Sequence, residues 1–268
     1  MTPYYADSLV TIYHGRMEDV LPSLFSIGLV FTSPPYNLGT STGGGLPGKL
    51  GHYRDKDGVG TRGGGGRHMG KWSGGALANG YGLHDDAMPH DGYVRWQQEC
   101  LRLCWTALSA DGAIFYNHKP RVLGGTLVSP LAYIPPELPV RQIVIWARAG
   151  GTNFSPAFYL PTHEWIVIVA KPEWRLKSKG ASGVGDVWRL AQESGTEHPA
   201  PFPVGLPARA IETTPDGTVL DPFMGSGSTL MAAKAAGRRS IGIEIEERWC
   251  EHAARRCSQE VLGLGVTS

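Results

Sequence analysis

The 268-residue sequence has little of several features that mark secreted, membrane or metal-binding proteins. Its first segment, MTPYYADSLV, lacks the basic region and apolar core of a signal peptide. The longest apolar runs, such as residues 165–170, have the length of a strand and cannot span a bilayer. The four cysteines form no Cys-x-x-Cys pair and have no metal-ligand spacing with histidines. We therefore expect a reduced, soluble, cytoplasmic protein without a metal.

A dominant charge of one sign is also missing, because 25 basic residues stand against 24 acidic ones. The total charge therefore points to no class of partner. With 41% hydrophobic residues, the chain has enough apolar material for a core, which argues against global disorder. The length fits one large domain over residues 1–268. Glycine is in excess: 17 of the 37 glycines lie within residues 39–82.

Residues 39–91 are predicted to form a mobile insertion, because a long glycine-rich run without hydrophobic periodicity cannot pack a core. The stretch 39–82 has six basic residues and two acidic ones, a net charge of +4 in a nearly neutral chain. Its basic residues include Lys49, Arg54, Arg62, Arg67 and Lys71. Two interpretations are open: a solvated insertion without a role, or a loop that closes over a polyanion.

Strand-like and helix-like segments alternate along the rest of the chain, which predicts an α/β fold. The predicted strands are residues 9–13, 28–33, 112–117, 141–146, 164–169, 218–223 and 240–245. The predicted helices are residues 17–24, 92–108, 204–213, 226–236 and 247–260. Cys100 and Cys104 lie one turn apart on the second helix and are expected to pack in the core. The simplest architecture is one doubly wound, mostly parallel sheet.

The segment LDPFMGSGST, residues 220–229, carries the first chemical signal. A predicted strand runs into a Gly-x-Gly turn that opens a helix, so the backbone can approach a ligand closely and offer unpaired N–H groups. Glu244 ends the next predicted strand, 19 residues after Gly225, where an acid suits the ribose hydroxyls of a nucleoside. A turn without a ligand is the plain alternative, and a nicotinamide site is disfavoured because the third glycine of that fingerprint is absent.

The second signal is TSPPYN, residues 32–37, at the end of a predicted buried strand. Two consecutive prolines fix an extended, rigid backbone. Ser33 and the Pro34 carbonyl then offer two acceptors, and Tyr36 offers a flat face for stacking. This set suits a planar ring that carries an exocyclic amine, although a purely structural Pro-Pro stop is the common alternative.

Taken together, the two segments resemble the motifs of the S-adenosylmethionine-dependent DNA amino-methyltransferases. Residues 33–36 match the [DNS]-P-P-[YF] catalytic motif, and residues 221–228 match the D-P-F-x-G-S-G-[ST] cofactor motif. The catalytic motif comes first, which is the permuted order of the group called beta. Residues 198–203, HPAPFP, are similar to the segment that this group places before its cofactor motif. The resemblance implies a Rossmann-like methyltransferase fold with circularly permuted motif order.

The resemblance also implies roles for individual residues. The target base would be held by Ser33, Pro34, Pro35 and Tyr36. The methionine part of S-adenosylmethionine would be cradled by Asp221, Pro222, Phe223, Gly225, Ser226, Gly227 and Ser228. Glu244 would bind the ribose hydroxyls. The cleft near the cofactor carboxylate would be lined by Pro201, Phe202 and Pro203.

Two departures from the family pattern affect these expectations. Gly15-Arg16 stands where the family often has Gly-Asp beside the cofactor adenine, so Glu18 and Asp19 are the candidate replacements for that acid. Residues 171–197, a polar and basic stretch predicted to be a loop, are short for a target-recognition region, which favours a homodimer as the arrangement that completes recognition. Phosphate contacts to DNA are expected from the basic residues of segment 39–82 and from Arg175, Lys177 and Lys179.

The implied reaction is methyl transfer to the exocyclic amine of a base flipped out of a DNA duplex. Serine at the first motif position favours N4 of cytosine, and N6 of adenine is the alternative. A C5-cytosine enzyme is disfavoured, because it needs a Pro-Cys pair and no cysteine here follows a proline. RNA and protein-glutamine methyltransferases place the two motifs in the opposite order. A catalytically inactive DNA-binding relative stays open because of the departure at Arg16.

Overall fold

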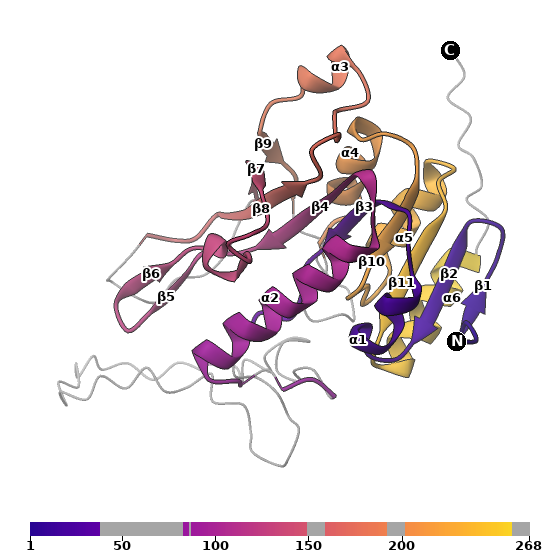
Figure 1. Ribbon diagram of the computed structural model, residues 1–268, viewed down its shortest axis with the longest axis horizontal. Coiled ribbons are helices and arrows are strands. Elements are labelled where there is room, and N and C mark those ends of the chain that lie inside the picture. The colour runs from indigo at the N-terminus through magenta and orange to yellow at the C-terminus, as the bar shows by residue number, and fades with distance from the viewer. Residues whose placement is uncertain (38–82, 86, 149–158, 192–201, 259–268) are drawn as a thin grey trace, which may run out of the picture.

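The computed structural model describes residues 1–37, 83–85, 87–148, 159–191 and 202–258, which form a sheet with helices on both faces (Figure 1). Within these residues the sheet has nine strands in the order β1-β2-β11-β10-β3-β4-β8-β7-β9. Its strands are β1 Tyr5–Ala6, β2 Val10–His14, β3 Ile27–Thr32, β4 Leu108–His118, β7 Val140–Ala147, β8 His163–Ala170, β9 Val187–Arg189, β10 Thr218–Asp221 and β11 Ser240–Glu244. A separate hairpin is made by β5 Arg121–Leu123 and β6 Thr126–Val128.

The centre of the sheet is parallel. Strands β2, β11, β10, β3 and β4 run in one direction, and β8 and β7 continue the sheet antiparallel. The predicted doubly wound, mostly parallel α/β fold is therefore confirmed. Strands β3 and β10 carry the two motifs and are direct neighbours, although they lie far apart in the sequence. The permuted motif order thus leaves the sheet continuous.

Helices cover both faces of the sheet. One face carries α1 Met17–Val20, η1 Leu21–Ser23, α2 His90–Ala107 and η3 Pro130–Tyr133, and the other carries α4 Gly205–Thr213, α5 Ser228–Ala235 and α6 Glu247–Ser258. Residues of β4 alternate between them: Ile114 and Tyr116 join the α2 side, whereas Ala113 and Phe115 join the α4–α5 side. In the described ranges, no helix combines the length and apolar character needed to cross a bilayer.

Two segments differ from the sequence prediction. Residues 171–191, predicted to be a loop, contain α3 Lys179–Ser182 and the short strand β9, which pairs with β7. The core contact of β9 is the buried Trp188, and one apolar residue among polar neighbours leaves no periodic pattern to detect. Helix α2 begins at His90, so the last residues of the predicted insertion are helical, and segment 39–82 lies outside the described residues. Cys100 and Cys104 are buried free thiols, as predicted.

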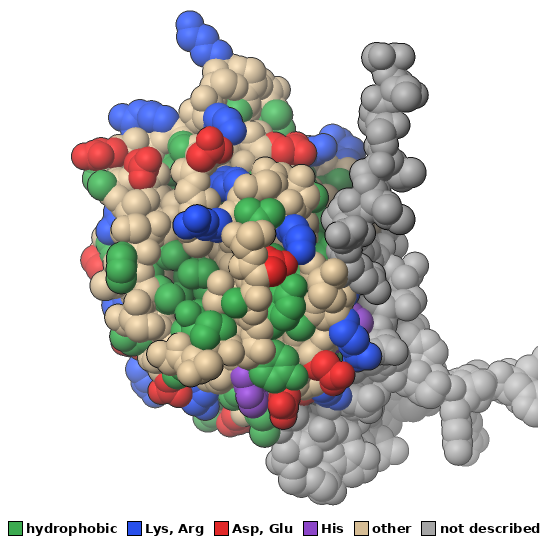
Figure 2. All heavy atoms as spheres, turned by 90° about the vertical axis from the view of Figure 1, so that its right-hand side faces the viewer, with side chains coloured by type: hydrophobic (Ala, Val, Ile, Leu, Met, Phe, Trp, Pro, Cys, Tyr) green, Lys and Arg blue, Asp and Glu red, His purple; other side chains and the backbone are tan. Residues whose placement is uncertain are grey.

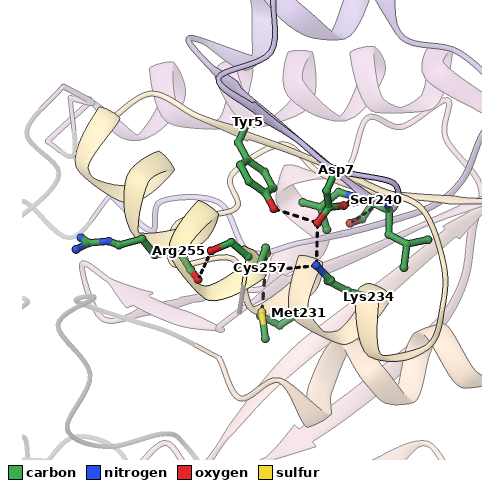
Figure 3. Close-up of polar contacts among 10 residues, drawn as sticks. Tyr5, Asp7, Met231, Lys234, Ser240, Arg255 and Cys257 are labelled. Atoms are coloured by element: carbon green, nitrogen blue, oxygen red, sulfur yellow. Dashed lines mark hydrogen bonds and ion pairs between the residues drawn. The ribbon is translucent and has the colours of Figure 1, made fainter. Parts of the chain in front are cut away.

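Hydrogen bonds link the N-terminal hairpin, formed by β1 and β2, to α5 and α6 (Figure 3). Lys234 of α5 donates to Asp7 Oδ2 at 2.8 Å and to the carbonyl of Cys257 in α6 at 2.5 Å. Burial raises the pKa of Asp7, but hydrogen bonds from Lys234, Tyr5 and two backbone N–H groups outweigh it and lower the pKa to about 2. This charged contact holds β1 and β2 against α5 and α6, next to the strands that carry the cofactor motif.

Candidate active site

A cavity lies at the carboxyl ends of β2, β3, β10 and β11. Its walls come from the segments that follow these four strands and from α2. In doubly wound sheets, ligands bind in the crevice outside the carboxyl ends of the strands, at the point where the strand order reverses. The cavity occupies that position, between β10 and β3.

Both sequence motifs contribute to this single cavity. All four residues predicted to hold the base, Ser33, Pro34, Pro35 and Tyr36, line it. Most residues predicted to hold the cofactor line it as well, namely Phe202, Pro222, Phe223, Gly225, Ser226, Ser228 and Glu244. The fold therefore brings together the two segments that the sequence singled out.

Asp221 lies behind the wall of the cavity instead of on it, because its side chain is 0% exposed. Its Oδ1 accepts from Thr32 Oγ1 and from the Phe223 backbone N–H, both at 3.1 Å, and its Oδ2 accepts from Thr229 Oγ1 at 2.6 Å. Burial raises its pKa to about 6 against these hydrogen bonds. Asp221 thus joins β3, the turn and α5, and its role is to shape the turn.

Gly227 and Pro203 were also predicted to contact the cofactor, but neither lines the cavity. Gly227 has a φ of 83°, and a Cβ added there would lie 3.0 Å from the Cβ of Ala253 in α6. This glycine is therefore needed for close packing between helices. Pro203 is buried and is not part of the cavity wall, whereas Pro201 lies outside the described residues.

Glu244 supports the glycine turn and also lines the cavity. Its Oε2 accepts from the backbone N–H of Gly225 at 3.0 Å, and its Oε1 accepts from that of Glu246 at 2.8 Å. Gly225 has a φ of 48°, a left-handed conformation that favours glycine. Burial raises the pKa of Glu244 to about 7, with a further contribution from the nearby Glu246 charge. Its protonation state therefore changes near neutral pH.

The loop after β3, which carries residues 33–37, is held from one side by hydrogen bonds to its carbonyl groups. The Pro35 carbonyl accepts from Tyr93 Oη at 2.7 Å and from Gln97 Nε2 at 3.4 Å, both in α2. The next two carbonyls along the chain accept from the Arg121 guanidinium at 2.7 and 2.9 Å. Within the described part of the chain, no donor reaches the Pro34 carbonyl. That oxygen matches the predicted free acceptor.

A buried polar cluster lies directly behind Ser33 and Tyr36. Tyr36 Oη lies 2.7 Å from Ser33 Oγ and donates to Glu164 Oε2 at 2.8 Å. Asn117 Nδ2 lies within 3.3 Å of all three oxygens. The second carboxylate oxygen of Glu164 faces Arg148 Nε at 3.6 Å. The sequence reasoning missed Glu164, although a carboxylate at the head of an otherwise apolar strand was a usable signal.

His118 packs against the ring of Tyr36. Its ring centroid is 4.6 Å from that of Tyr36, and Tyr93 Oη lies 2.9 Å from its Nε2. Burial lowers the pKa of His118 to about 3, so the ring is neutral at physiological pH. This histidine is fully buried at the end of β4 and does not line the cavity.

The acid missing after Gly15 has a structural counterpart. Glu18 lines the cavity, and its Oε1 accepts from Trp96 Nε1 at 3.0 Å and from Arg16 at 3.3 Å. Trp96 in turn meets the ring of Phe223 edge-on at 5.6 Å. Of the two candidates from the sequence, Glu18 therefore lines the cavity and Asp19 does not.

The predicted DNA contacts divide into two groups. Lys49, Arg54, Arg62, Arg67 and Lys71 lie outside the described residues. Lys177 pairs with Asp216, just before β10, at 2.9 Å, and its backbone N–H donates to Thr213. Arg175 and Lys179 belong to the same segment, at the amino ends of the parallel strands. The structure thus places Arg175, Lys177 and Lys179 at the edge of the sheet opposite the cavity.

Comparison with known proteins places this geometry in a family. The model of a family described as DNA methylase, N6_N4_Mtase, matches residues 27–255. The chain belongs to the N6/N4 DNA methylase family. The match includes the Ser33–Tyr36 loop after β3, the glycine turn after β10 and β11 with Glu244, so most of the residues that line the cavity lie within the matched region.

Relatives of this methylase family extend over nearly the whole chain. The type II methyltransferase M.ScaI of Streptomyces caespitosus is 27% identical over 98% of this chain and 86% of its own length. M.BglII of Bacillus subtilis is 28% identical over 93% of this chain and 69% of its own length. Among solved structures, the cytosine-N4-specific PvuII DNA methyltransferase covers 97% of this chain and 90% of its own, with a TM-score of 0.67 at 18% identity. The M1.HpyAVI complex with S-adenosylmethionine covers 94% and 100%, with a TM-score of 0.61 and 18% identity.

Proposed function

We propose that this DNA methylase transfers a methyl group from S-adenosylmethionine to the exocyclic amine of a DNA base, with N4 of cytosine favoured and N6 of adenine as the alternative. The observation that carries the proposal is one cavity lined both by the Ser33-Pro-Pro-Tyr36 loop and by the glycine turn after β10. Family membership supports DNA as the substrate. The likeness to a fold neighbour named as cytosine-N4-specific supports the choice of base.

The residues of the cavity fit S-adenosylmethionine, which supplies an activated methyl group on a positively charged sulfur. Gly242 lets β11 pack closely beneath the turn, because a Cβ added there would lie 2.3 Å from Met224 Sδ. Gly225 and Ser226 present the turn to the cavity. In this proposal Glu244 accepts the ribose hydroxyls, and Glu18 supplies the acidic group beside the adenine that Arg16 cannot.

The catalytic loop must activate a poor nucleophile. The lone pair of an exocyclic amine on cytosine or adenine is delocalised into the ring. Hydrogen bonds from the amine to Ser33 Oγ and to the Pro34 carbonyl draw its nitrogen toward tetrahedral geometry and localise the lone pair. Both acceptors lie on the rigid loop held by Tyr93 and Arg121, so catalysis rests on positioning and electrostatics.

The target base has to leave the duplex before it can enter this cavity. Tyr36 lines the cavity and offers the ring against which a flipped base stacks. A homodimer remains our expectation for sequence recognition, because residues 171–191 contribute a strand and a short helix and leave little of the segment for a recognition module. Sedimentation of the protein with and without DNA measures that assembly directly.

The reaction is tested by incubating the protein with methyl-labelled S-adenosylmethionine and DNA, followed by digestion to nucleosides and mass spectrometry. We expect label on N4-methyl-2′-deoxycytidine. A Ser33→Ala variant that still binds cofactor is the control, and it should lose most of the signal. Label on N6-methyladenine would overturn the choice of base. Absence of label on any DNA would overturn the proposed function.

A further inference from the structure

Glu164 is a carboxylate buried directly behind the catalytic loop. It lies near the start of β8, is 5% exposed, and does not line the cavity. Its contact with the cavity wall runs through Tyr36, whose Oη donates to Oε2 at 2.8 Å. Its other carboxylate oxygen, Oε1, faces Arg148 at 3.6 Å. Burial of a carboxylate is costly unless its oxygens are satisfied, so this position has a specific set of partners.

The carboxylate fixes the direction of every hydrogen bond in the cluster. An ionised carboxylate can only accept, and a tyrosine hydroxyl has a single hydrogen. Because Tyr36 gives that hydrogen to Glu164, its oxygen can only accept from Ser33, which lies 2.7 Å away. The Ser33 hydroxyl therefore donates inward, toward Tyr36.

The orientation of Asn117 follows from the same carboxylate. Its Nδ2 donates toward Glu164 Oε2 at 2.9 Å, toward Tyr36 Oη at 3.0 Å and toward Ser33 Oγ at 3.3 Å. Among the described residues, its Oδ1 is buried without a hydrogen-bond partner. An amide turned the other way would point Oδ1 at the carboxylate, and two acceptors would then face each other. Leaving Oδ1 without a partner costs less free energy than that arrangement.

These constraints leave one free lone pair on the Ser33 oxygen. The hydrogen of its hydroxyl is given to Tyr36, and one lone pair accepts from Asn117. The remaining lone pair is available on the cavity side, since Ser33 lines the cavity. A serine hydroxyl is by itself equally able to donate or accept, and a donor there would repel the N–H groups of a target amine.

We propose that Glu164 is the positioning residue that makes Ser33 an acceptor for the target amine, and that it receives the proton which the amine loses. This inference rests on the proposed function, because it concerns the amine that enters the same cavity. Tyr36 and Asn117 connect Glu164 to Ser33, and their hydrogen bonds set the direction in which the Ser33 hydroxyl points.

The transfer step balances with these groups alone. The amine lone pair forms the new nitrogen–carbon bond while the carbon–sulfur bond breaks and leaves its electron pair on sulfur. The amine then releases one proton to Ser33 Oγ, Ser33 passes its own proton to Tyr36, and Tyr36 passes its proton to Glu164 Oε2. Glu164 ends neutral, and the proton returns to solvent after the product leaves. No other acid, base or metal is required by this sequence.

The test is Glu164→Gln, which keeps the volume and an oxygen that can accept from Tyr36 but removes the charge and the proton acceptor. The glutamine amide can also donate to Tyr36. The direction of the hydrogen bonds that join residue 164, Tyr36 and Ser33 is then no longer fixed. We expect kcat to fall by about 100-fold, within the range for loss of acid–base participation. The KM for DNA and the equilibrium Kd for S-adenosylmethionine should change by less than about threefold, because Glu164 touches neither ligand.

Glu137→Gln is the matched control, because it removes a carboxylate from the exposed ion pair with Arg102 at 2.7 Å. It should leave kcat unchanged. The Tm of each variant shows whether a lower kcat comes from loss of folding or from the changed hydrogen bonds at Ser33. A Glu164→Gln protein that folds, binds both ligands and keeps kcat within about twofold of the parent overturns the proposal, while a parent without any methyl transfer overturns the proposed function instead.

Tyr36→Phe supplies a second route if Glu164→Gln does not fold, because it leaves the carboxylate in place and cuts its link to Ser33. We expect kcat to fall with the cofactor Kd unchanged. Combined with Glu164→Gln, the two losses should not add, since both interrupt one chain. A double variant whose loss equals the product of the single losses would show that Glu164 acts independently of Ser33, and would overturn the proposal.

Discussion

At the residue scale, Asp221 and Glu244, the two acids predicted to bind the cofactor, have different surroundings and different roles. Asp221 is fully enclosed by hydrogen bonds that join β3, the turn and α5, so it has no face left for a ligand. Glu244 uses its oxygens to hold the turn but also borders the cavity. Burial raises the pKa of Asp221 to about 6 and that of Glu244 to about 7. The acid that borders the cavity is thus Glu244.

This pKa predicts a pH-dependent affinity for S-adenosylmethionine. Ribose hydroxyls donate to the carboxylate form of Glu244, and a raised pKa means that this form is lost as the pH falls through about 7. Between pH 8 and pH 6 the ionised fraction falls from about 0.9 to about 0.1, so the Kd should rise by about tenfold. Isothermal titration calorimetry across this range measures the change.

Glu244→Gln provides the control for that titration, because an amide does not ionise between pH 6 and pH 8. The variant should bind the cofactor more weakly and with a flatter pH dependence than the parent. Equal pH dependence in the two proteins would show that another group is responsible.

The motif residues could be predicted from the sequence because their chemistry is encoded locally. Ser33 and Tyr36 are three positions apart, and the glycine turn follows its strand directly. Glu164 and Asn117 could not be assigned in this way, because Glu164 meets Tyr36 across 128 positions of sequence and Asn117 meets it across 81. Such partners are set by sheet register, here the pairing of β4 with β8, which no short motif contains.

At the scale of elements, the strands and helices of the core could largely be predicted because each buries several apolar residues at a regular spacing. The exceptions are short. β9 has one buried residue, Trp188, and β5 and β6 form a hairpin without any fully buried residue. These elements owe their structure to neighbours, β7 in the case of β9, and not to a pattern of their own.

The packing of β11 against α5 depends on a missing side chain. A Cβ on Gly242 would lie 2.3 Å from Met224 Sδ and within 3.0 Å of both terminal methyl groups of Leu230. Gly242→Ala should therefore destabilise the protein by about 1–3 kcal/mol, the usual range for overpacking a core. It should also weaken cofactor binding, because Met224 lies in the turn itself. Denaturant unfolding and a cofactor titration measure the two effects.

Gly92→Ala is the companion substitution for that experiment. Gly92 lies in α2, and nothing stands within 4 Å of a Cβ placed there. Alanine in a helix is favoured over glycine by up to about 1 kcal/mol, so this variant should be as stable as the parent or more stable. Equal stability of the two alanine variants would contradict the close-packing role of Gly242.

At the scale of the whole molecule, the charge of residues 39–82 differs from that of the rest of the chain. Acidic and basic side chains are interspersed on the face formed by the right-hand side of Figure 1, as Figure 2 shows. The chain as a whole has a net charge of +1, while residues 39–82 alone carry six basic and two acidic residues. The rest of the chain is therefore slightly acidic, and residues 39–82 hold the excess of basic residues.

The residues that flank the basic segment 39–82 lie at the cavity. Tyr36, just before it, and His84, just after it, both line the cavity. The side chain of Asn37 pairs with the backbone of Met88 at 2.7 and 2.8 Å, which joins the two ends. In contrast, Arg175 and Lys177 lie at the opposite edge of the sheet, where Lys177 is already paired with Asp216. Position and charge thus favour the segment over this cluster as the source of phosphate contacts.

Deletion of residues 43–66 tests this assignment, since it removes four basic and two acidic residues and keeps both anchored ends. We expect weaker DNA binding and a shallower dependence of log K on log salt, by about 0.9 for each lost phosphate contact. The Kd for S-adenosylmethionine should not change, because Glu244 and the glycine turn are untouched. The double variant Arg175→Ala, Lys177→Ala is the control and should bind DNA like the parent. Fluorescence anisotropy at several salt concentrations measures both, and unchanged DNA affinity after the deletion would refute the assignment.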